Sequence, residues 1–488
     1  MKSNIIKQFL FLLLLPSKLW AAIHPIDVVG KYFVDSITKE RFYIKGVDYQ
    51  PGGSSEELSK SDPLSDPEKC ARDIVLFQEL GINTIRIYSI NPDLDHDKCM
   101  TMLAAAGIYL LLDVNSPVQG QHLNRYEPWS TYTMSYVQHI FKVVEKFSYY
   151  NNTLGFFAGN EVVNDMKSAQ FSPKYIKVII GDLKKYIEKH SPRSIPVGYS
   201  AADDLNYRAS LASYLECAEE KGDTYNSVDF YGVNSYQWCG TQTMESSGYD
   251  KLIRTYSSYT KPIIFSEFGC NQVLPRQFDE VKALFSKPMT PTFSGGLVYE
   301  FTQESNNYGL VSLDSEGNAH ILGDFEKLKN TYKEIPPLRS KEMSKFIVAD
   351  ETLNVTSKQA FFNKHQLPIC KNRYDNLNIE GTAIRSVASP IIFKGNHGLR
   401  GYYVTLEDKD LQCEYEIYDI NGKARSKESK RIKVVNDLKS EKQETIVRSS
   451  GVEAASLENS SPKRNFGSQI LRLGMLCMLI FFSMMFLT

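Results

Sequence analysis

Two glutamates stand where a pair of carboxyl groups could do chemistry. Glu161 directly follows the apolar run of residues 154–160, and Glu267 ends the run of residues 262–267. Short apolar runs bounded by turn residues are typical of buried strands in a parallel sheet. A carboxylate at the C-terminal tip of such a strand lies where barrel enzymes keep their reactive groups. Two such carboxylates are the minimum apparatus for cleaving a glycosidic bond.

The pair could support a retaining mechanism, in which one carboxyl group is acid and base and the other is the nucleophile, about 5–5.5 Å away. Asn160 precedes Glu161 and could form a hydrogen bond with the 2-hydroxyl of the sugar that strengthens in the transition state. A single glutamate after a strand is more often a solvated loop residue or a neighbour of a helix N-terminus. Two of them, one in an Asn-Glu pair, favour chemistry, but their spacing does not say which glutamate has which role.

Polar and aromatic residues also follow the other predicted strands. Aromatic faces stack on the apolar faces of sugars, while amides and carboxylates bind hydroxyl groups. The candidates for substrate binding are Gln50, Tyr88, Asp113, Asn115, Asn160, Tyr236, Trp238 and Tyr299. The eight histidines are scattered, and neither a Gly-x-Ser-x-Gly elbow nor a phosphate-binding glycine loop is present. The residues therefore favour a saccharide cleft.

Eight alternations of strand-like and helix-like segments between residues 23 and 335 could position these groups. They predict a (β/α)8 barrel, which typically needs about 250 residues, with Glu161 on the fourth strand and Glu267 on the seventh. A doubly wound sheet is the competing architecture, but it gives no reason for eight similar units. The predicted strands are 42–47, 84–88, 109–114, 154–160, 195–200, 230–234, 262–265 and 296–301, and the helical patterns include 70–80, 132–147, 175–190 and 278–285.

The character of the chain changes after the predicted barrel. Residues 336–420 contain weak strand signals at 390–393, 402–406 and 415–420, and predict a small appended region. Residues 421–459 are rich in Lys, Glu and Ser with few large apolar side chains, which is typical of a solvated, disordered stalk.

Both ends of the chain carry targeting patterns. Lys2 and Lys7 precede an apolar stretch and a small-residue site, so residues 1–22 are predicted to be a secretory signal peptide. At the other end, small residues, a polar spacer and a terminal apolar segment match a GPI-anchor signal, with Asn459 as the attachment residue and 460–488 removed. An ordinary tail-anchoring helix is the alternative, although the apolar tail is short for a membrane span. The mature protein is thus expected on the outer face of the plasma membrane.

The cysteines and the charge are consistent with this route. Cys477 lies in the segment to be removed, which leaves seven cysteines, so disulfides are expected with one cysteine left over. No CxxC or histidine-rich cluster is present, and neither a metal nor a cofactor is expected. A formal net charge of −1 gives no indication of nucleic-acid binding. Asn151 and Asn354 begin N-glycosylation sequons.

Six sequence blocks around these candidate residues together resemble fungal GPI-anchored β-1,3-glucanosyltransferases of the Gas/Gel/Phr group, which is glycoside hydrolase family 72. The resemblance spans about residues 24–335. It is closest to the short yeast branch, since a cysteine-rich carbohydrate-binding module is missing after the barrel. Some members of that branch resemble spore-wall proteins. The blocks are KGVDYQP (45–51), NTIRIY (83–88), GNE (159–161), YGVNSY (231–236), FSEFGCN (265–271) and GGLVYE (295–300).

The resemblance implies roles that spacing leaves open. By analogy Glu161 is the acid/base and Glu267 is the nucleophile of an enzyme that cleaves an internal β-1,3 linkage and transfers the new reducing end to another glucan chain. A retaining endo-β-1,3-glucanase and a catalytically weak glucan-binding protein are the alternatives, and a monomer is expected. Gln50, Tyr88, Asn160, Tyr236 and Tyr299 match positions that line the donor and acceptor subsites. The implied disulfides are Cys70–Cys99, Cys239–Cys270 and Cys217–Cys370, with Cys413 unpaired.

Overall fold

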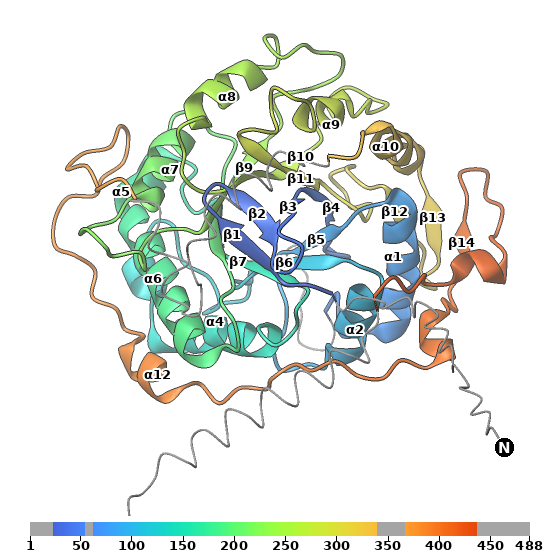
Figure 1. Cartoon of the computed structure of the whole chain (residues 1–488), viewed down its shortest axis with the longest axis horizontal. Helices are drawn as coiled ribbons and strands as arrows, with labels where there is room; N and C mark the ends of the chain where they lie inside the picture. Colours follow the sequence, from blue (N-terminus) through green and yellow to red (C-terminus); the bar gives the residue numbers. More distant parts are fainter. Residues whose placement is uncertain (1–22, 54–61, 339–366, 437–488) are drawn as a thin grey trace, which may run out of the picture. The chain divides into compact units, whose positions relative to one another are not determined.

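The protein is built around a closed barrel of eight parallel strands, which a computed structural model describes over residues 23–53, 62–338 and 367–436 (Figure 1). The predicted (β/α)8 architecture is confirmed, and the doubly wound sheet is excluded because the eighth strand pairs with the first. The strands are β4 (Ile44–Asp48), β5 (Thr84–Ile87), β6 (Tyr109–Asp113), β7 (Thr153–Asn160), β8 (Val197–Ala201), β9 (Phe230–Ser235), β10 (Ile263–Phe268) and β11 (Phe293–Val298).

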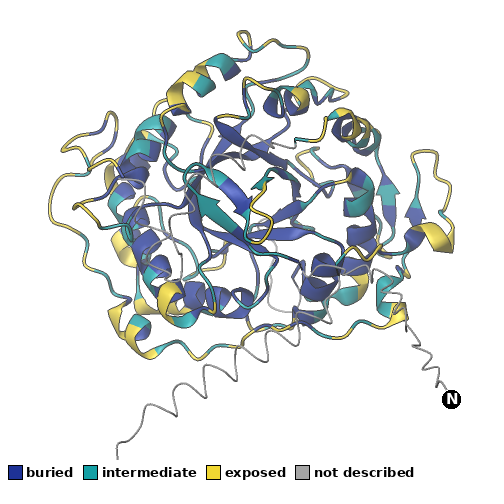
Figure 2. Cartoon of the chain, in the orientation of Figure 1, coloured by how far each residue is buried: buried dark blue, intermediate teal, exposed yellow. Residues whose placement is uncertain are grey.

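The strands form the core because they are apolar along nearly their whole length. Every residue of β5, β6, β8, β9, β10 and β11 is buried, as expected for a parallel sheet covered by helices outside and filled by side chains inside. Figure 2 shows the buried strands at the centre and the exposed residues on the outer helices and loops.

Helices between the strands surround the barrel. The first of them, α1, shows why these segments begin and end where they do: Asp66 accepts hydrogen bonds from two backbone N–H groups at its start, and Gly81 follows its last residue with a left-handed φ of 70°. The helices are α1 (Pro67–Leu80), α2 (Asp97–Ala105), α3 (Pro128–Thr131), α4 (Met134–Phe147), α5 (Met166–Phe171), α6 (Pro173–His190), α7 (Arg208–Glu216), α8 (Tyr249–Tyr256), α9 (Asp279–Leu284) and α10 (Gly323–Glu334).

A small antiparallel sheet covers the end of the barrel opposite the candidate glutamates. It consists of β1 (Ile26–Val29), β2 (Tyr32–Asp35) and β3 (Arg41–Phe42). Phe33 packs on Phe230, and Phe42 packs on Tyr109, with ring centroids 5.6 and 5.1 Å apart. Because Phe230 and Tyr109 are the first residues of their strands, this sheet closes the N-terminal end and leaves the C-terminal end as the mouth.

The strand boundaries differ from the prediction mainly at the eighth strand. β11 begins at Phe293, three residues earlier than expected, because Gly295 to Val298 pair with Ile44 to Val47 of β4. Tyr299 and Glu300 therefore lie just beyond the strand, at the mouth. Glu267 lies inside β10 rather than after it.

The chain after the barrel contacts the outside of the helices. β12 (Val311–Leu313) and β13 (Ala319–Ile321) form a hairpin that pairs with β14 (Ile417–Tyr418). The backbone of residues 367–436 lies against α7, α6, α4, α2 and α1. Three hydrogen bonds mark its path: Ala218 N to Pro368 O at 2.9 Å, Asn396 N to Tyr186 Oη at 2.8 Å and Val435 N to Ala105 O at 2.8 Å. The 3-10 helices η1 (Asp408–Leu411) and η2 (Lys427–Lys430) belong to this segment.

Three expectations for this region are wrong. The strand signal at 390–393 lies in the helix α12 (Ser389–Lys394), where Pro390 occupies a first-turn position that needs no N–H donor. Residues 402–406 form no strand with any described residue. The predicted stalk also begins too early, because residues 421–436 pack on the barrel through pairs such as Arg425 with Glu79. Residues 437–459 lie outside the described residues.

The three disulfides implied by the resemblance are confirmed: Cys70–Cys99, Cys217–Cys370 and Cys239–Cys270. Cys413 is buried and unpaired. Asn151 is partly buried in the turn before β7, while Asn354, Asn459 and the two terminal targeting segments lie outside the described residues. Among the helices that the structure describes, none has the length and apolar character needed to span a bilayer.

Candidate active site

The carboxylate of Glu267 receives three donors at the mouth of the barrel. Its Oε1 accepts hydrogen bonds from the hydroxyl of Tyr88 at 2.9 Å and from the guanidinium of Arg86 at 3.3 Å. Its Oε2 accepts one from the hydroxyl of Tyr236 at 3.0 Å. Glu267 is 8% exposed, so these donors act where little water screens them. Donors of this kind favour an ionised carboxylate.

Arg86 organises the acidic groups beneath Glu267. Its guanidinium is fully buried and forms a bidentate pair with Asp113, with both N···O distances at 3.0 Å. Its remaining nitrogen contacts the Ser266 carbonyl oxygen at 3.2 Å and lies 4.0 Å from Asp48. Burial raises the pKa of Asp48 well above its usual value, and the carboxylate of Glu267 raises it further while Arg86 lowers it. The guanidinium of Arg86 is thus the shared cation of three carboxyl groups, those of Asp48, Asp113 and Glu267. These three groups cannot all be ionised without strong repulsion.

Glu161 is held by an amide whose orientation is fixed. Asn234 Nδ2 donates to Glu161 Oε1 at 2.7 Å. Asn234 Oδ1 accepts hydrogen bonds from the hydroxyls of Ser200 and Ser266 at 3.1 and 2.8 Å, which turns its NH2 group toward Glu161. Gly232 leaves room for this network, because a Cβ there would meet Ser266 Oγ at 2.5 Å.

The backbone of Glu161 is itself unusual. Its φ is 48°, in the left-handed region that a residue with a Cβ rarely adopts. Its N–H donates to Ser200 O at 2.9 Å, which holds this conformation at the tip of β7. Strained backbone of this kind is concentrated at functional sites, where the surrounding structure enforces it.

The two glutamates influence each other electrostatically. Burial raises the pKa of Glu267 to about 7, Arg86 lowers it, and the negative charge of Glu161 raises it. Glu267 also pairs in register with Asn234, the residue that donates to Glu161. The carboxyl groups from the fourth and seventh barrel strands therefore face one site, as the sequence predicts.

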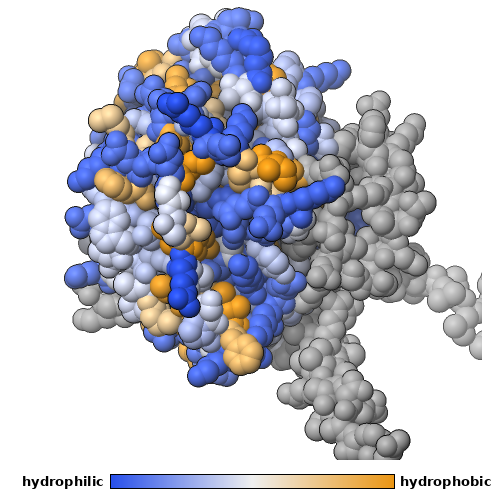
Figure 3. Space-filling model, turned by 90° about the vertical axis from the view of Figure 1, so that its left-hand side faces the viewer, coloured by the Kyte–Doolittle hydropathy of each residue, from blue (hydrophilic) through white to orange (hydrophobic). Residues whose placement is uncertain are grey.

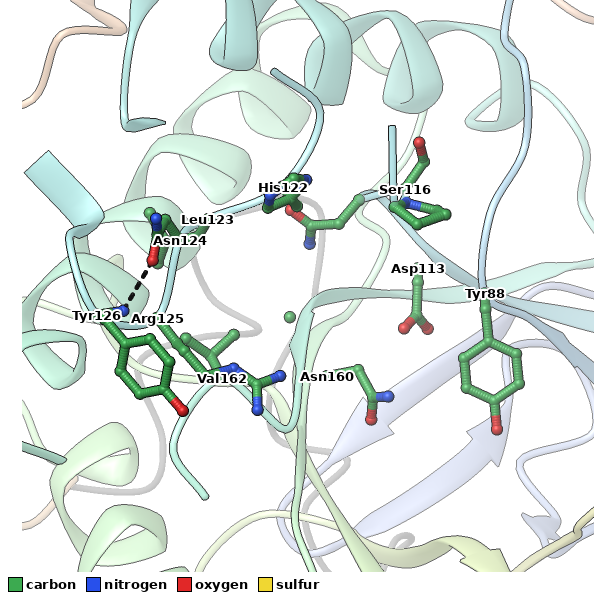
Figure 4. A pocket seen from close by; sticks show the side chains of 13 residues that line it. Tyr88, Asp113, Ser116, His122, Leu123, Asn124, Arg125, Tyr126, Asn160 and Val162 are labelled. Atoms are coloured by element: carbon green, nitrogen blue, oxygen red, sulfur yellow. Dashed lines mark hydrogen bonds between the residues drawn. The ribbon is translucent and has the colours of Figure 1, made fainter. Parts of the chain in front are cut away.

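A cavity of about 590 Å³ opens beside this centre (Figure 4). Tyr88, Asp113 and Asn160 form its inner wall, while Arg125 and Tyr126 from the loop after β6 lie at its far side. Asn160 Oδ1 is buried and accepts no hydrogen bond from the described residues, so it is available to a ligand. The volume falls within the range of ligand sites in enzymes.

The structure brings most, but not all, of the predicted binding residues together. The ring of Tyr299 packs edge-on against Tyr88 and Tyr236, with centroids 6.4 and 6.3 Å apart. Asn115 lines the cavity, but its amide is engaged by Ala158 O and by the Tyr136 hydroxyl.

The other two predicted binding residues are buried. Gln50 is 1% exposed and accepts hydrogen bonds from the backbone of Tyr88 and Ser89, while its Nε2 has no partner among the described residues. Trp238 is 6% exposed, and its ring packs on Tyr249 of α8, with centroids 5.0 Å apart, rather than joining the tyrosine cluster.

Three residues of the site were not predicted as site residues: Asp48, Arg86 and Asn234. Each is a buried polar residue of a barrel strand, with Asp48 at the end of β4 and Arg86 and Asn234 within β5 and β9, and that position is the signal that could have identified them. In the part of the chain that the structure describes, no group of three or more His, Cys, Asp or Glu residues is arranged to hold a metal ion.

Comparisons with known proteins point to one family. The family model described as glucanosyltransferase matches residues 16–336. The 1,3-beta-glucanosyltransferase GAS4 of Saccharomyces cerevisiae is 56% identical over 429 residues, covering 87% of this chain and 88% of the relative. The 1,3-beta-glucanosyltransferase gel2 of Aspergillus fumigatus is 48% identical over 403 residues, covering 82% of each chain.

Solved structures of Saccharomyces cerevisiae Gas2p share the fold. Gas2p in complex with laminaritriose and laminaritetraose matches with a TM-score of 0.62 and 40% identity, covering 67% of this chain and 72% of that chain. The Gas2p apostructure matches with a TM-score of 0.64 and 37% identity, covering 73% and 71%.

Proposed function

The chain belongs to the glucanosyltransferase family, glycoside hydrolase family 72, and we propose that Glu161 and Glu267 carry out its reaction. The protein is a 1,3-β-glucanosyltransferase, and β-1,3-glucan is its substrate. The observation that carries the assignment of roles is the unequal surroundings of the two carboxyl groups. Among the described residues, three donors, one of them cationic, face Glu267, whereas a single amide faces Glu161.

This asymmetry supports the assignment of roles. Arg86 and the two tyrosine hydroxyls stabilise the ionised form of Glu267, which is the form that a nucleophile needs. Glu161 accepts a hydrogen bond from the neutral amide of Asn234, and we assign it the role of acid and base.

The reaction then proceeds by double displacement. The ionised Glu267 attacks the anomeric carbon of a β-1,3 linkage, the bond to the leaving oxygen breaks, and Glu161 gives that oxygen its proton. The reducing-end fragment departs, and the remaining glucan is an ester of Glu267. Glu161, now a base, takes the proton of the 3-hydroxyl at the non-reducing end of a second glucan. That oxygen attacks the anomeric carbon and releases Glu267.

Substrate binding is assigned to the residues that surround this pair. Asn160 offers its unpartnered Oδ1 to a hydroxyl group of the sugar. Tyr88 and Tyr236 each place a hydroxyl on Glu267, and their rings together with Tyr299 form one wall of the mouth. Transfer prevails over hydrolysis when an acceptor sugar occupies the mouth and excludes water from the ester.

A product analysis tests this function. A soluble form ending at Ser450 is incubated with a reduced β-1,3-gluco-oligosaccharide, and the products are separated by length. Products longer than the substrate support transfer, only shorter products indicate an endo-glucanase, and unchanged substrate indicates a binding protein. Glu267→Gln should abolish turnover. Glu280→Gln is the matched control, because burial also raises the pKa of Glu280 to about 7 but this residue lies on α9, away from the mouth.

Azide rescue separates the two roles. With an activated aryl β-laminari-oligosaccharide, Glu161→Ala still forms the ester on Glu267, and azide then attacks it to give the β-glycosyl azide. Glu267→Ala instead lets azide attack the substrate directly, which gives the α-glycosyl azide. The opposite pairing of variant and product would reverse the assignment.

The protein acts outside the cell, at the wall. Within that location, the sequence patterns support removal of residues 1–22, glycosylation at Asn151 and Asn354, and attachment of a GPI anchor at Asn459 after loss of residues 460–488. The mature chain is a monomer on the plasma membrane. Phosphatidylinositol-specific phospholipase C should release the protein from membranes, and release should be lost in Asn459→Gln. Retention after phospholipase treatment would instead support a membrane-inserted tail.

A further inference from the structure

Exposed aromatic residues gather on one side of the cavity described above. Tyr126, Trp129 and Phe171 are 36, 53 and 36% exposed. Trp129 and Phe171 contact each other edge to face, with ring centroids 5.4 Å apart. Figure 3 shows the side of the molecule on which α5 and α6 lie, where the surface is mostly hydrophilic and hydrophobic residues form small separate groups. A cluster of three large aromatic side chains on such a surface is typical of a binding site.

The spacing of the aromatic residues is set by α5. Lys167 places its ammonium group 4.8 Å from the centre of the Tyr126 ring, while Phe171 contacts Trp129. Lys167 and Phe171 are four residues apart, so they lie on the same face of the helix, one turn or about 5.4 Å from each other along its axis. Tyr126 and Trp129 therefore contact side chains on successive turns of one face of α5.

These residues are continuous with the catalytic cavity. Tyr126 lines the cavity whose inner wall includes Tyr88 and Asn160, and in Figure 4 its side chain lies across the cavity from theirs. A chain that leaves the catalytic centre through this cavity passes Tyr126, and Trp129 follows three residues further along the polypeptide, on α3.

The loop that carries the platform is held in place. The Tyr126 hydroxyl donates to Asp165 Oδ2 at 2.8 Å, and the backbone N–H of Tyr126 donates to Asn124 Oδ1 at 3.0 Å. Ser172 Oγ, at the end of α5, donates to the carbonyl oxygen of Arg125 at 2.7 Å. The aromatic rings are thus positioned before any ligand arrives, which lowers the entropy lost on binding.

We propose that Tyr126, Trp129 and Phe171 form a distal platform that binds the glucan chain several sugar units away from the bond that reacts. The platform takes a β-1,3-glucan, because it extends the cavity of the active site and offers aromatic faces to the apolar faces of sugar rings. It acts on long chains and leaves short oligosaccharides unaffected. This inference rests on the proposed function.

Kinetics as a function of chain length test the platform. The full-length chain is purified in detergent as wild type and as Trp129→Ala, and transfer is measured with short laminari-oligosaccharides and with long soluble laminarin. Trp129→Ala should raise KM for laminarin by about three- to tenfold, with kcat unchanged and with short substrates unaffected. Trp129→Tyr, which keeps an aromatic face, should restore most of the affinity.

Phe393→Ala is the matched control. Phe393 is 76% exposed on α12 and, like Tyr126, lies under a lysine, with Lys189 Nζ 4.5 Å from its ring centre, but it does not line the cavity. Its removal should leave KM for laminarin unchanged. An equal effect of Trp129→Ala on short and long substrates, or no effect on either, would overturn the platform. If the wild type yields no lengthened product, the proposed function fails instead, so the two failures are distinguishable.

Discussion

Removal of one hydroxyl group, in Tyr236→Phe, should change the pH at which the enzyme becomes active. The Tyr236 hydroxyl donates to Glu267 Oε2 at 3.0 Å, and among the described residues no other group donates to that oxygen. Its hydrogen bond lowers the pKa of Glu267. Without it the ionised form of Glu267 loses a donor at a nearly buried position, and its pKa rises.

The size of the shift follows from the strength of the lost bond. A hydrogen bond to a charged group contributes about 1.5–3 kcal/mol, and one pKa unit corresponds to about 1.4 kcal/mol. The pKa of Glu267 should therefore rise by about one to two units. Since Glu267 must be ionised to attack, activity that disappears as the pH falls will disappear at a pH that is higher by the same amount.

The pH dependence of kcat/KM for transfer measures this shift, because it reports ionisations of the free enzyme. Tyr88→Phe, which removes the 2.9 Å bond to Oε1, should move the acidic limb in the same direction. Tyr299→Phe should not, because the Tyr299 hydroxyl makes no hydrogen bond to Glu267 among the described contacts. An unchanged acidic limb with a lower plateau in Tyr236→Phe would refute the reasoning and make this hydroxyl a sugar-binding group.

Three further perturbations have definite expected outcomes. Burial raises the pKa of Glu267 to about 7, above its value of about 4.3 in the unfolded chain, so the unfolded chain ionises first. The folded state therefore loses up to about 3 kcal/mol of stability as the pH rises from about 4.5 to 7. The Tm of Glu267→Gln minus that of wild type should increase over this pH range, and a constant difference would contradict the linkage. Arg86→Lys removes the bidentate pair and should lower kcat/KM by about tenfold to a hundredfold, with unchanged circular dichroism. Loss of Cys217–Cys370 in a double alanine variant opens a loop of 153 residues and should lower the free energy of unfolding by about 4–5 kcal/mol in a denaturant titration.

The sequence predicts the barrel well because its strands are nearly continuous apolar runs. A run such as residues 154–160 is buried on both sides of the sheet, so its hydrophobicity alone marks a strand. The ends of strands are less certain, because the last residues at the mouth are polar and their pairing depends on neighbouring strands. The start of β11 was missed because Ser294 and Gly295 show no hydrophobic signal, and only the pairing of Phe293 with β10 and of Gly295 with β4 places this segment in a strand.

Charge composition is a weaker guide to disorder. Residues 421–436 have the composition of a solvated stalk, yet Arg425 pairs with Glu79 of α1, and Lys430 pairs with Glu416 at 3.0 Å. The apolar contribution of this segment is small but definite, since Ile432 is 2% exposed. Whether a charged segment finds partners depends on the charges of a surface far away in the sequence, which local composition does not describe.

Arg86 and Asn234 show why part of the site escaped prediction. Both lie within apolar strands, and each acts on a carboxylate of another strand: Arg86 of the second barrel strand on Glu267 of the seventh, and Asn234 of the sixth on Glu161 of the fourth. Only closure of the barrel makes these strands face each other across the interior. The spacing of residues along the chain carries no information about that juxtaposition.

These two residues also give an argument for the roles of the glutamates that does not depend on resemblance. If Glu161 were the nucleophile and Glu267 the acid, Arg86 would favour the ionised form of the acid and leave it without the proton that the leaving oxygen needs. Among the described contacts, the nucleophile would then have only the neutral Asn234 amide to stabilise its charge. In the proposed assignment the charged nucleophile lies beside a cation and two hydroxyl groups, and the acid lies beside a neutral amide.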